Sequence, residues 1–265
     1  MNPMNTKKEP WRFQHCSHDE IAAYFAANDL VIIPTGSCEQ HGFHLPLITD
    51  TAIAEALADR VAQQEGVLVL PALPYGNSSN HECFPGTVTV EPRTYVRFVQ
   101  DMVGSLLRHG AKKIMFINGH SGNAASLQET CDFARENGGF ACVVNWYAII
   151  GELEPSMALS GHGDFVETSP LLALYPDLVR LDKVKPYTTA RLSENLEFVQ
   201  WYGLRFRGAT VDTWVKTQDV SPQGNLGSMQ DSSAETGERI LRTMGDFLSG
   251  LVRELKTVDL TKLRN

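Results

Sequence analysis

The chain has 265 residues, enough for one large domain or two small ones, and 43% of them are apolar, as is ordinary for a globular protein. The formal net charge of −8 argues against a nucleic acid or an anionic membrane as a partner. No apolar run could span a bilayer and residues 1–11 do not look like a signal peptide, so we expect a cytoplasmic protein.

Short apolar runs alternate with helical patterns over the first two-thirds of the chain. Ser17 and Glu20 form a capping box, which predicts the start of a helix. In chain order, we predict helices over residues 21–29, 51–66, 92–110, 121–138, 168–175 and 232–258, and strands over residues 30–36, 67–73, 112–118 and 140–147. Residues 177–231 have no clean period, and we predict them to be loop-rich.

Strands that alternate with helices predict an α/β fold with a mostly parallel central sheet and helices on both faces. No internal repeat, low-complexity tract or linker interrupts the pattern. We therefore predict a single domain over residues 1–265, with its core at about residues 15–258.

Polar segments that each contain at least one histidine follow three of the predicted strands. They read TGSCEQHGFHLPLITD (35–50), NGHSGN (118–123) and SGHGDFVETS (160–169). Ligands of open α/β sheets bind beyond the carboxyl ends of the strands, where these segments lie. We therefore expect the active site there.

The residue types in these segments are ligands for a divalent metal. Glu39 and His41 are two apart and project to one side of an extended segment, Asp50 opens the next helix, and His120 follows a strand. Zn²⁺ and Mn²⁺ accept imidazole nitrogen and carboxylate oxygen together, and a carboxylate can bridge two ions. The five cysteines are dispersed without a C-x-x-C pair, which argues against a thiolate zinc site and a disulfide scaffold.

Each of these residues also has a plainer interpretation. A lone histidine after a strand usually faces solvent or caps a helix, Asp50 suits a helix N-cap, and Glu167 suits the first turn of a helix. The placement of all of them at one edge of one sheet favours a shared site. For His44 and His81, a substrate contact and a hydrogen bond within a loop are equally good alternatives, and GHSGN is not a nucleophile elbow.

With these residues in hand, the chain resembles the creatininase (creatinine amidohydrolase) family. The resemblance rests on PTGSCEQHGFHLPLITD, NSSNHECFPGT, INGHSGN, GHGDFVETS and GNLGSMQDSSAETGERI, and extends from about residue 30 to 245. It implies a single α/β domain, two Zn²⁺ or Mn²⁺ ions per subunit and a homohexamer. It also implies metal ligands at Glu39, His41, Asp50 (the bridging position) and His120, and a catalytic histidine at His162.

One departure from the family pattern bears on the ligand set. Creatininases resemble one another in a Tyr and a metal-binding Glu directly after the NGH histidine, and here these positions are Ser121 and Gly122. We therefore predict Glu167, from the ETS element, as the fifth ligand, with a catalytic role as the alternative. The missing Tyr argues against creatinine as the substrate. We predict substrate contacts from His81, Ser121 and Asn123.

The predicted function is hydrolysis of a C–N bond in a small cyclic or linear amide by a two-metal activated water. His162 would carry the proton to the leaving nitrogen. One alternative is cleavage of a C–C bond in a cyclic keto-polyol of the inosose type at the same centre. Another, from a different class, is a metal-binding protein without catalysis.

Overall fold

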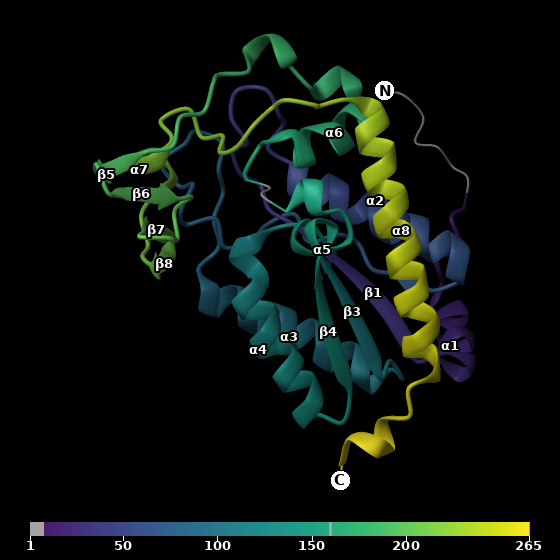
Figure 1. The fold of residues 1–265 in the computed structure, drawn as a ribbon. Helices are drawn as coiled ribbons and strands as arrows, with labels where there is room; N and C mark the ends of the chain where they lie inside the picture. The colour runs from purple at the N-terminus through teal and green to yellow at the C-terminus, as the bar shows by residue number, and fades with distance from the viewer. Residues whose placement is uncertain (1–7, 159–160, 265) are drawn as a thin grey trace.

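The computed structural model describes residues 8–158 and 161–264, and its centre is a parallel four-stranded sheet (Figure 1). The strands are β1 (Leu30–Thr35), β2 (Leu68–Val69), β3 (Lys113–Asn118) and β4 (Phe140–Asn145), in the order β2-β1-β3-β4. Every residue of β1 and β3 is buried, which explains why both read as continuous apolar runs rather than as alternating ones.

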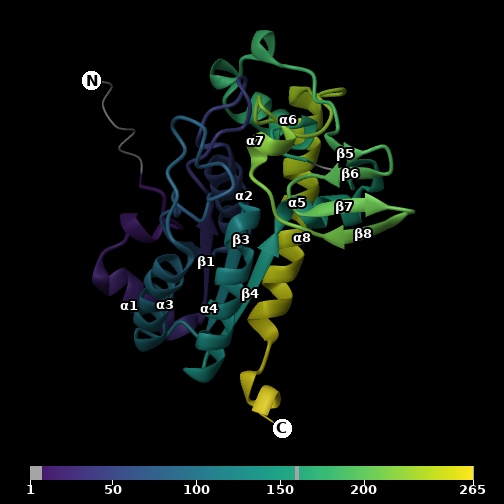
Figure 2. The ribbon, with the colours of Figure 1, turned by 90° about the vertical axis from the view of Figure 1, so that its left-hand side faces the viewer.

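Helices cover both faces of this sheet, as Figure 2 shows with α8 on one side and α3 and α4 on the other. Leu30 and Ile32 of β1 pack with one group of helices, whereas Val31 and Ile33 pack with the other. The first group comprises α2 (Thr49–Glu65), α6 (Phe165–Leu174) and α8 (Ala234–Thr257), and the second comprises α1 (His18–Ala27), α3 (Pro92–Arg108) and α4 (Ala124–Glu136). The prediction of a parallel α/β sheet covered on both faces is confirmed.

The helix boundaries follow the local signals in the sequence. The Ser17–Glu20 capping box opens α1, and Pro92 is the first residue of α3. Gly66 closes α2 with φ of 61°, a left-handed conformation that glycine adopts without strain. Short 3-10 helices lie at Phe13–His15, Ser121–Asn123, Pro155–Met157, Pro176–Leu178, Leu181–Lys183 and Leu260–Arg264.

Residues 177–231 include long loops, as predicted, but the prediction missed a second, antiparallel sheet in this segment. Its strands, in order, are β5 (Arg191–Ser193), β6 (Leu196–Val199), β7 (Gly203–Phe206) and β8 (Ala209–Asp212), and α7 (Thr217–Val220) follows them. These strands have three or four mostly exposed residues, too few to produce a readable apolar alternation. A small cluster of Phe198, Trp201, Val220 and Leu226 anchors the sheet.

Two further elements differ from the prediction. The strand expected over 67–73 is regular only at Leu68–Val69, and the rest of the segment is irregular apart from an isolated bridge between Leu73 and Thr35. The strand expected over 140–147 ends at Asn145, and α5 (Trp146–Leu153) follows it directly. Among the described residues, none of the helices combines the length and apolarity needed to cross a membrane.

The strand order places a crevice between β1 and β3. The chain steps from β1 to β2 on one side and then to β3 on the other, so the order reverses at β1. The last residues of these two strands, Thr35 and Asn118, are paired and joined through their side chains at 3.0 Å. The segments that follow them, which carry the predicted ligands, therefore begin side by side.

Candidate metal centre

Four segments bring the predicted metal ligands together at the carboxyl end of the sheet. They are the loop after β1, the first turn of α2, the loop after β3 and the first turn of α6. They contribute Glu39 and His41, Asp50, His120 and Glu167, in that order, and all five are buried.

Three groups of possible ligand atoms occur among the described residues; one is Glu39, His41 and His162, and Asp50 belongs to the other two. One group is Glu39, Asp50 and His120, the other is His41, Asp50 and Glu167, and within each group the ligand atoms lie within 4.8 Å of one another. Asp50 Oδ1 is 2.9 Å from His41 Nε2, and Asp50 Oδ2 is 3.1 Å from His120 Nδ1. Each carboxylate oxygen thus faces a different group, which is the geometry of a bridging ligand.

The plainer interpretation of Asp50 as a helix cap does not hold. The N-cap of α2 is Ile48, and Asp50 lies inside the first turn, where its Oδ2 accepts a hydrogen bond from Ser37 Oγ at 2.7 Å. The helix therefore presents this carboxylate to the histidines rather than to its own backbone.

His41 and His120 each bind a main-chain carbonyl with one ring nitrogen. His41 Nδ1 donates to the Glu39 carbonyl at 3.1 Å, and His120 Nε2 donates to the Asn77 carbonyl at 2.8 Å. Because a carbonyl only accepts, the opposite nitrogen of each neutral ring carries a lone pair toward the carboxylates. Metal-binding histidines typically have this arrangement, in which the outer hydrogen bond fixes the tautomer.

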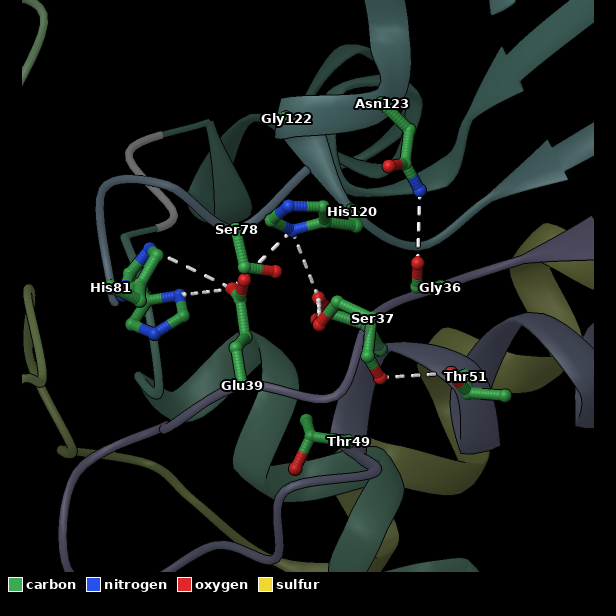
Figure 3. Close-up of polar contacts among 12 residues, drawn as sticks. Gly36, Ser37, Glu39, Thr49, Thr51, Ser78, His81, His120, Gly122 and Asn123 are labelled. Carbon is green, nitrogen blue, oxygen red and sulfur yellow. Dashed lines mark hydrogen bonds and ion pairs between the residues drawn. The ribbon is translucent and has the colours of Figure 1, made fainter. Parts of the chain in front are cut away.

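The Glu39 carboxylate indicates that the site fits a cation. Both of its oxygens are buried and neither has a hydrogen-bond partner. The nearest nitrogens to Oε1 are His120 Nδ1 at 3.3 Å, His81 Nε2 at 3.6 Å and His162 Nδ1 at 3.8 Å. Figure 3 shows His81 and His120 pointing toward this carboxylate from opposite sides. A buried carboxylate without donors is costly, and a bound divalent ion would supply the missing partner.

The electrostatics of the cluster lead to the same conclusion. Burial alone would lower the pKa of His41, but the carboxylates of Asp50 and Glu167 outweigh burial and raise it to about 10. Burial raises the pKa of Glu167 to about 8. In metal-free protein, the cluster thus holds protons on His41 and Glu167, and divalent ions would displace those protons.

Gly122 explains why the loop after β3 offers no second ligand. A Cβ at this position would lie 2.1 Å from the Asn77 carbonyl oxygen and 2.5 Å from His120 Nε2. Glu167 approaches from α6 instead, with its Oε2 3.6 Å from His41 Nε2 and bound by the Gly163 amide at 2.6 Å.

His162 lies beside the cluster with one nitrogen free. Its Nε2 donates to the Gln40 carbonyl at 2.6 Å, so Nδ1 of the neutral ring is bare and faces Glu39. Burial and the charge on His41 hold the pKa of His162 well below its usual range. Burial likewise lowers the pKa of His81 to about 3. Both rings are therefore neutral at physiological pH.

A cavity of about 430 Å³ opens onto the cluster. One part of its wall is aromatic and comes from Tyr147, Trp201, Tyr202 and Trp214. Another is polar but uncharged, from Asn77, Ser79, Asn80, Ser121 and Gln200. None of the described residues that line the cavity is Lys or Arg, and its volume suits a small molecule.

The three residues predicted to contact the substrate do not all line the cavity. His81 and Ser121 line the cavity, but Asn123 does not. The Asn123 side chain is fully buried, donating to the Gly36 carbonyl at 2.9 Å and accepting from the Asn77 amide at 3.1 Å, so the prediction that it contacts substrate was wrong. It ties the loops after β1 and β3 together (Figure 3).

Other residues of the same segments are structural. His44 bonds Thr168 at 3.1 Å and does not line the cavity. Asp164 is the buried N-cap of α6. Two residues of the site were not predicted: Gln40, whose carbonyl binds His162, and Tyr147, which lines the cavity. The position of Gln40 between Glu39 and His41 could have identified it as a site residue.

Comparison with known proteins gives matches along most of the chain. The family model described as creatininase, creatinine amidohydrolase, matches residues 14–252. The creatinine amidohydrolase of Pseudomonas putida is 32% identical over 89% of this chain and 93% of its own length. The mycofactocin precursor peptide peptidase of Mycolicibacterium smegmatis is 35% identical over 81% of each chain. The 3-dehydro-scyllo-inosose hydrolase of Thermotoga maritima is 27% identical over 92% of this chain and 83% of its own.

Solved structures resemble this one over nearly the whole chain. A mutant creatininase of the Zn-Zn type is 30% identical, with a TM-score of 0.78 over 94% of this chain and 100% of its own. A manganese creatininase is 29% identical, with the same TM-score and coverage. The single-domain α/β fold with a parallel sheet is common to these structures and to this chain.

Proposed function

The chain belongs to the creatininase family of hydrolases, and from that premise we propose that it cleaves a C–N bond of a small cyclic or linear amide with two divalent metal ions. The proposed ligands are Glu39, Asp50 and His120 for one ion and His41, Asp50 and Glu167 for the other. Zn²⁺ and Mn²⁺ are the proposed metals, because creatininase structures contain them and the ligand types suit both.

The observation that carries the proposal is the position of Asp50. Its two oxygens face two different ligand groups, beside a Glu39 carboxylate that has no protein donor. A single-ion site or a purely structural cluster would need neither feature. Two ions at such a site would lower the pKa of the attacking water and polarise the substrate carbonyl.

In the proposed mechanism, the side chains of the protein orient the substrate and move the proton. The aromatic wall and the amides of Asn77 and Asn80 hold the substrate against the cluster. His162 Nδ1 accepts a proton from the attacking water as the C–O bond forms, and donates it to the leaving nitrogen as the C–N bond breaks. The absence of Lys and Arg among the described lining residues favours a substrate without a carboxylate to be recognised.

A second candidate is hydrolysis of a C–C bond in a cyclic keto-polyol of the inosose type. The polar, uncharged part of the cavity wall suits hydroxyl groups, and one relative is an inosose hydrolase. A metal-binding protein without catalysis is less well supported, because it would need neither a cavity at the cluster nor a neutral His162 facing it.

A substrate panel tests these candidates. Purified protein loaded with Zn²⁺ or Mn²⁺ is assayed with cyclic amides, linear amides, short peptides and inososes. We expect turnover of an amide that is abolished by a strong chelator and by His120→Ala, which also loses bound metal. Turnover that survives chelation would refute the mechanism, and stoichiometric metal without turnover of any compound would support the non-catalytic alternative.

A further inference from the structure

Gln40 lies in the motif between two proposed ligands, Glu39 and His41, but its side chain points away from the metal cluster toward two histidines. It is buried, with 5% of its surface exposed. Its amide nitrogen lies 2.7 Å from His81 Nδ1, 3.1 Å from His162 Nε2 and 3.2 Å from the Gly224 carbonyl. Its amide oxygen lies 2.9 Å from the Gly42 amide.

These contacts fix which end of the Gln40 amide donates. The Gly42 N–H can only donate, so the atom that it meets is the oxygen, and the Gly224 carbonyl can only accept, so the atom that it meets is the nitrogen. His162 Nε2 donates its own proton to the Gln40 carbonyl and so cannot accept from the Gln40 amide. The two N–H groups of Gln40 therefore go to the Gly224 carbonyl and to His81 Nδ1. His81 Nδ1 is therefore an acceptor, and the proton of the neutral ring is on Nε2.

This makes His81 the exception among the four histidines around the cluster. The other three, which are His41, His120 and His162, donate one ring N–H to a main-chain carbonyl, and their opposite ring nitrogens face the carboxylates. His81 instead accepts from Gln40 and turns Nε2–H toward the cavity, where this nitrogen is 3.6 Å from Glu39 Oε1.

The backbone of the same residue controls the neighbouring ring. The Gln40 carbonyl accepts from His162 Nε2 at 2.6 Å, which leaves His162 Nδ1 bare, and the His81 and His162 rings lie 4.3 Å apart. Trp201 makes a T-shaped contact with each of these rings, with ring centroids 5.2 Å from His81 and 5.8 Å from His162. Gln40 thus makes His81 a donor through its side chain and His162 an acceptor through its carbonyl, and the two rings lie next to each other beside the metal cluster.

We propose that Gln40 is a positioning residue that fixes His81 as the hydrogen-bond donor to the substrate and His162 as the proton acceptor. In amide hydrolysis, the donor stabilises the oxygen on which charge develops, and the acceptor takes the proton of the attacking water. Gly224 is part of the device, because a Cβ there would lie 1.8 Å from the Gln40 side-chain oxygen. The catalytic half of this inference rests on the proposed function, whereas the tautomer of His81 does not.

The first test measures the tautomer without metal or substrate. Long-range ¹H–¹⁵N correlation spectra of histidine-labelled, metal-free protein distinguish a bare from a protonated ring nitrogen, and His81→Asn assigns the His81 signals. We expect Nδ1 of His81 to be bare and Nε2 to be protonated in the wild type. A protonated Nδ1 would overturn the inference whatever any variant does.

The second test uses Gln40→Met, which keeps the length of the side chain but removes its hydrogen bonds. We expect His81 to become a mixture of tautomers and kcat to fall by about 10–100-fold, as for other residues that orient a site histidine, with KM changing much less. The matched control is Thr87→Val, which removes the 3.1 Å hydrogen bond to the Gln40 backbone amide and loosens the same loop.

The outcomes separate positioning from general loosening of the loop. The control should keep the His81 tautomer and most of kcat. An unchanged His81 tautomer in Gln40→Met, or an equal fall of kcat in Thr87→Val, would overturn the inference. If no substrate is turned over, the proposed function fails, but the spectra still decide whether Gln40 sets the tautomer.

Discussion

Replacing Glu167 by Gln tests the one proposed ligand that comes from α6 rather than from the loop after β3. The Glu167→Gln variant would keep the shape of the side chain and could still accept from the Gly163 amide, but it would remove the charge beside His41 and Asp50. We expect bound metal to fall from two ions to one per chain, since only His41 and Asp50 would remain for the second ion.

The pKa values of His41 and Glu167 determine how strongly the affinity for the second ion depends on pH. In metal-free protein near neutral pH, His41 is protonated because its pKa is raised to about 10, and Glu167 is protonated because its pKa is raised to about 8. The second ion must displace both protons, so its affinity rises with pH until the pKa values are reached. Displacing two protons changes the binding free energy of the second ion by about 2.7 kcal/mol per pH unit, so its affinity changes roughly 100-fold per pH unit. In the variant only the His41 proton is displaced, and the affinity of that site changes roughly tenfold per pH unit.

The assay is a chelator-buffered titration of Zn²⁺ or Mn²⁺ at several pH values below about 7.5, with total metal measured by elemental analysis. Glu235→Gln is the matched control, because Glu235 also lies in the first turn of a helix but is exposed. It should retain two ions and the steeper pH dependence. Two ions in the Glu167 variant together with a collapse of kcat would refute the ligand role and make Glu167 a catalytic base.

Three further predictions concern two residues of the loops around the cluster and the assembly of the chain. Gly122→Ala should lower metal affinity and cost about 1–3 kcal/mol of stability by overpacking against the Asn77 carbonyl, as measured by metal titration and denaturant unfolding; an unchanged affinity would contradict the described packing. Asp164→Ala removes the hydrogen bonds from the Val166 and Gly161 amides and should lower the free energy of unfolding by about 0.5–2 kcal/mol; no loss would show that the cap is dispensable. Light scattering should give the mass of a homohexamer, as the family resemblance predicts, and a monomeric mass would refute that prediction.

Much of the site could be predicted because it depends on neighbours in the sequence. Glu39 and His41 follow one buried strand and His120 follows another, so parallel strands place them at one edge. Asn123 shows where this reasoning ends. It lies in the same loop as His120, but its side chain turns inward to join two loops, and only the packing of those loops decides that direction.

The sequence alone determined the parallel α/β sheet, most helix boundaries and the segments that hold the candidate ligands, because apolar periodicity, caps and strand ends are local properties of the chain. Tertiary structure alone decided three things: the small antiparallel sheet that supplies Trp201 to the cavity wall, the partner of Gln40, and the ring nitrogen that His81 presents. The last two depend on side chains that are distant in sequence, and hydrogen bonds between them form only after the chain has folded. The small sheet pairs neighbouring strands, but these are too short and too exposed to produce a readable apolar alternation.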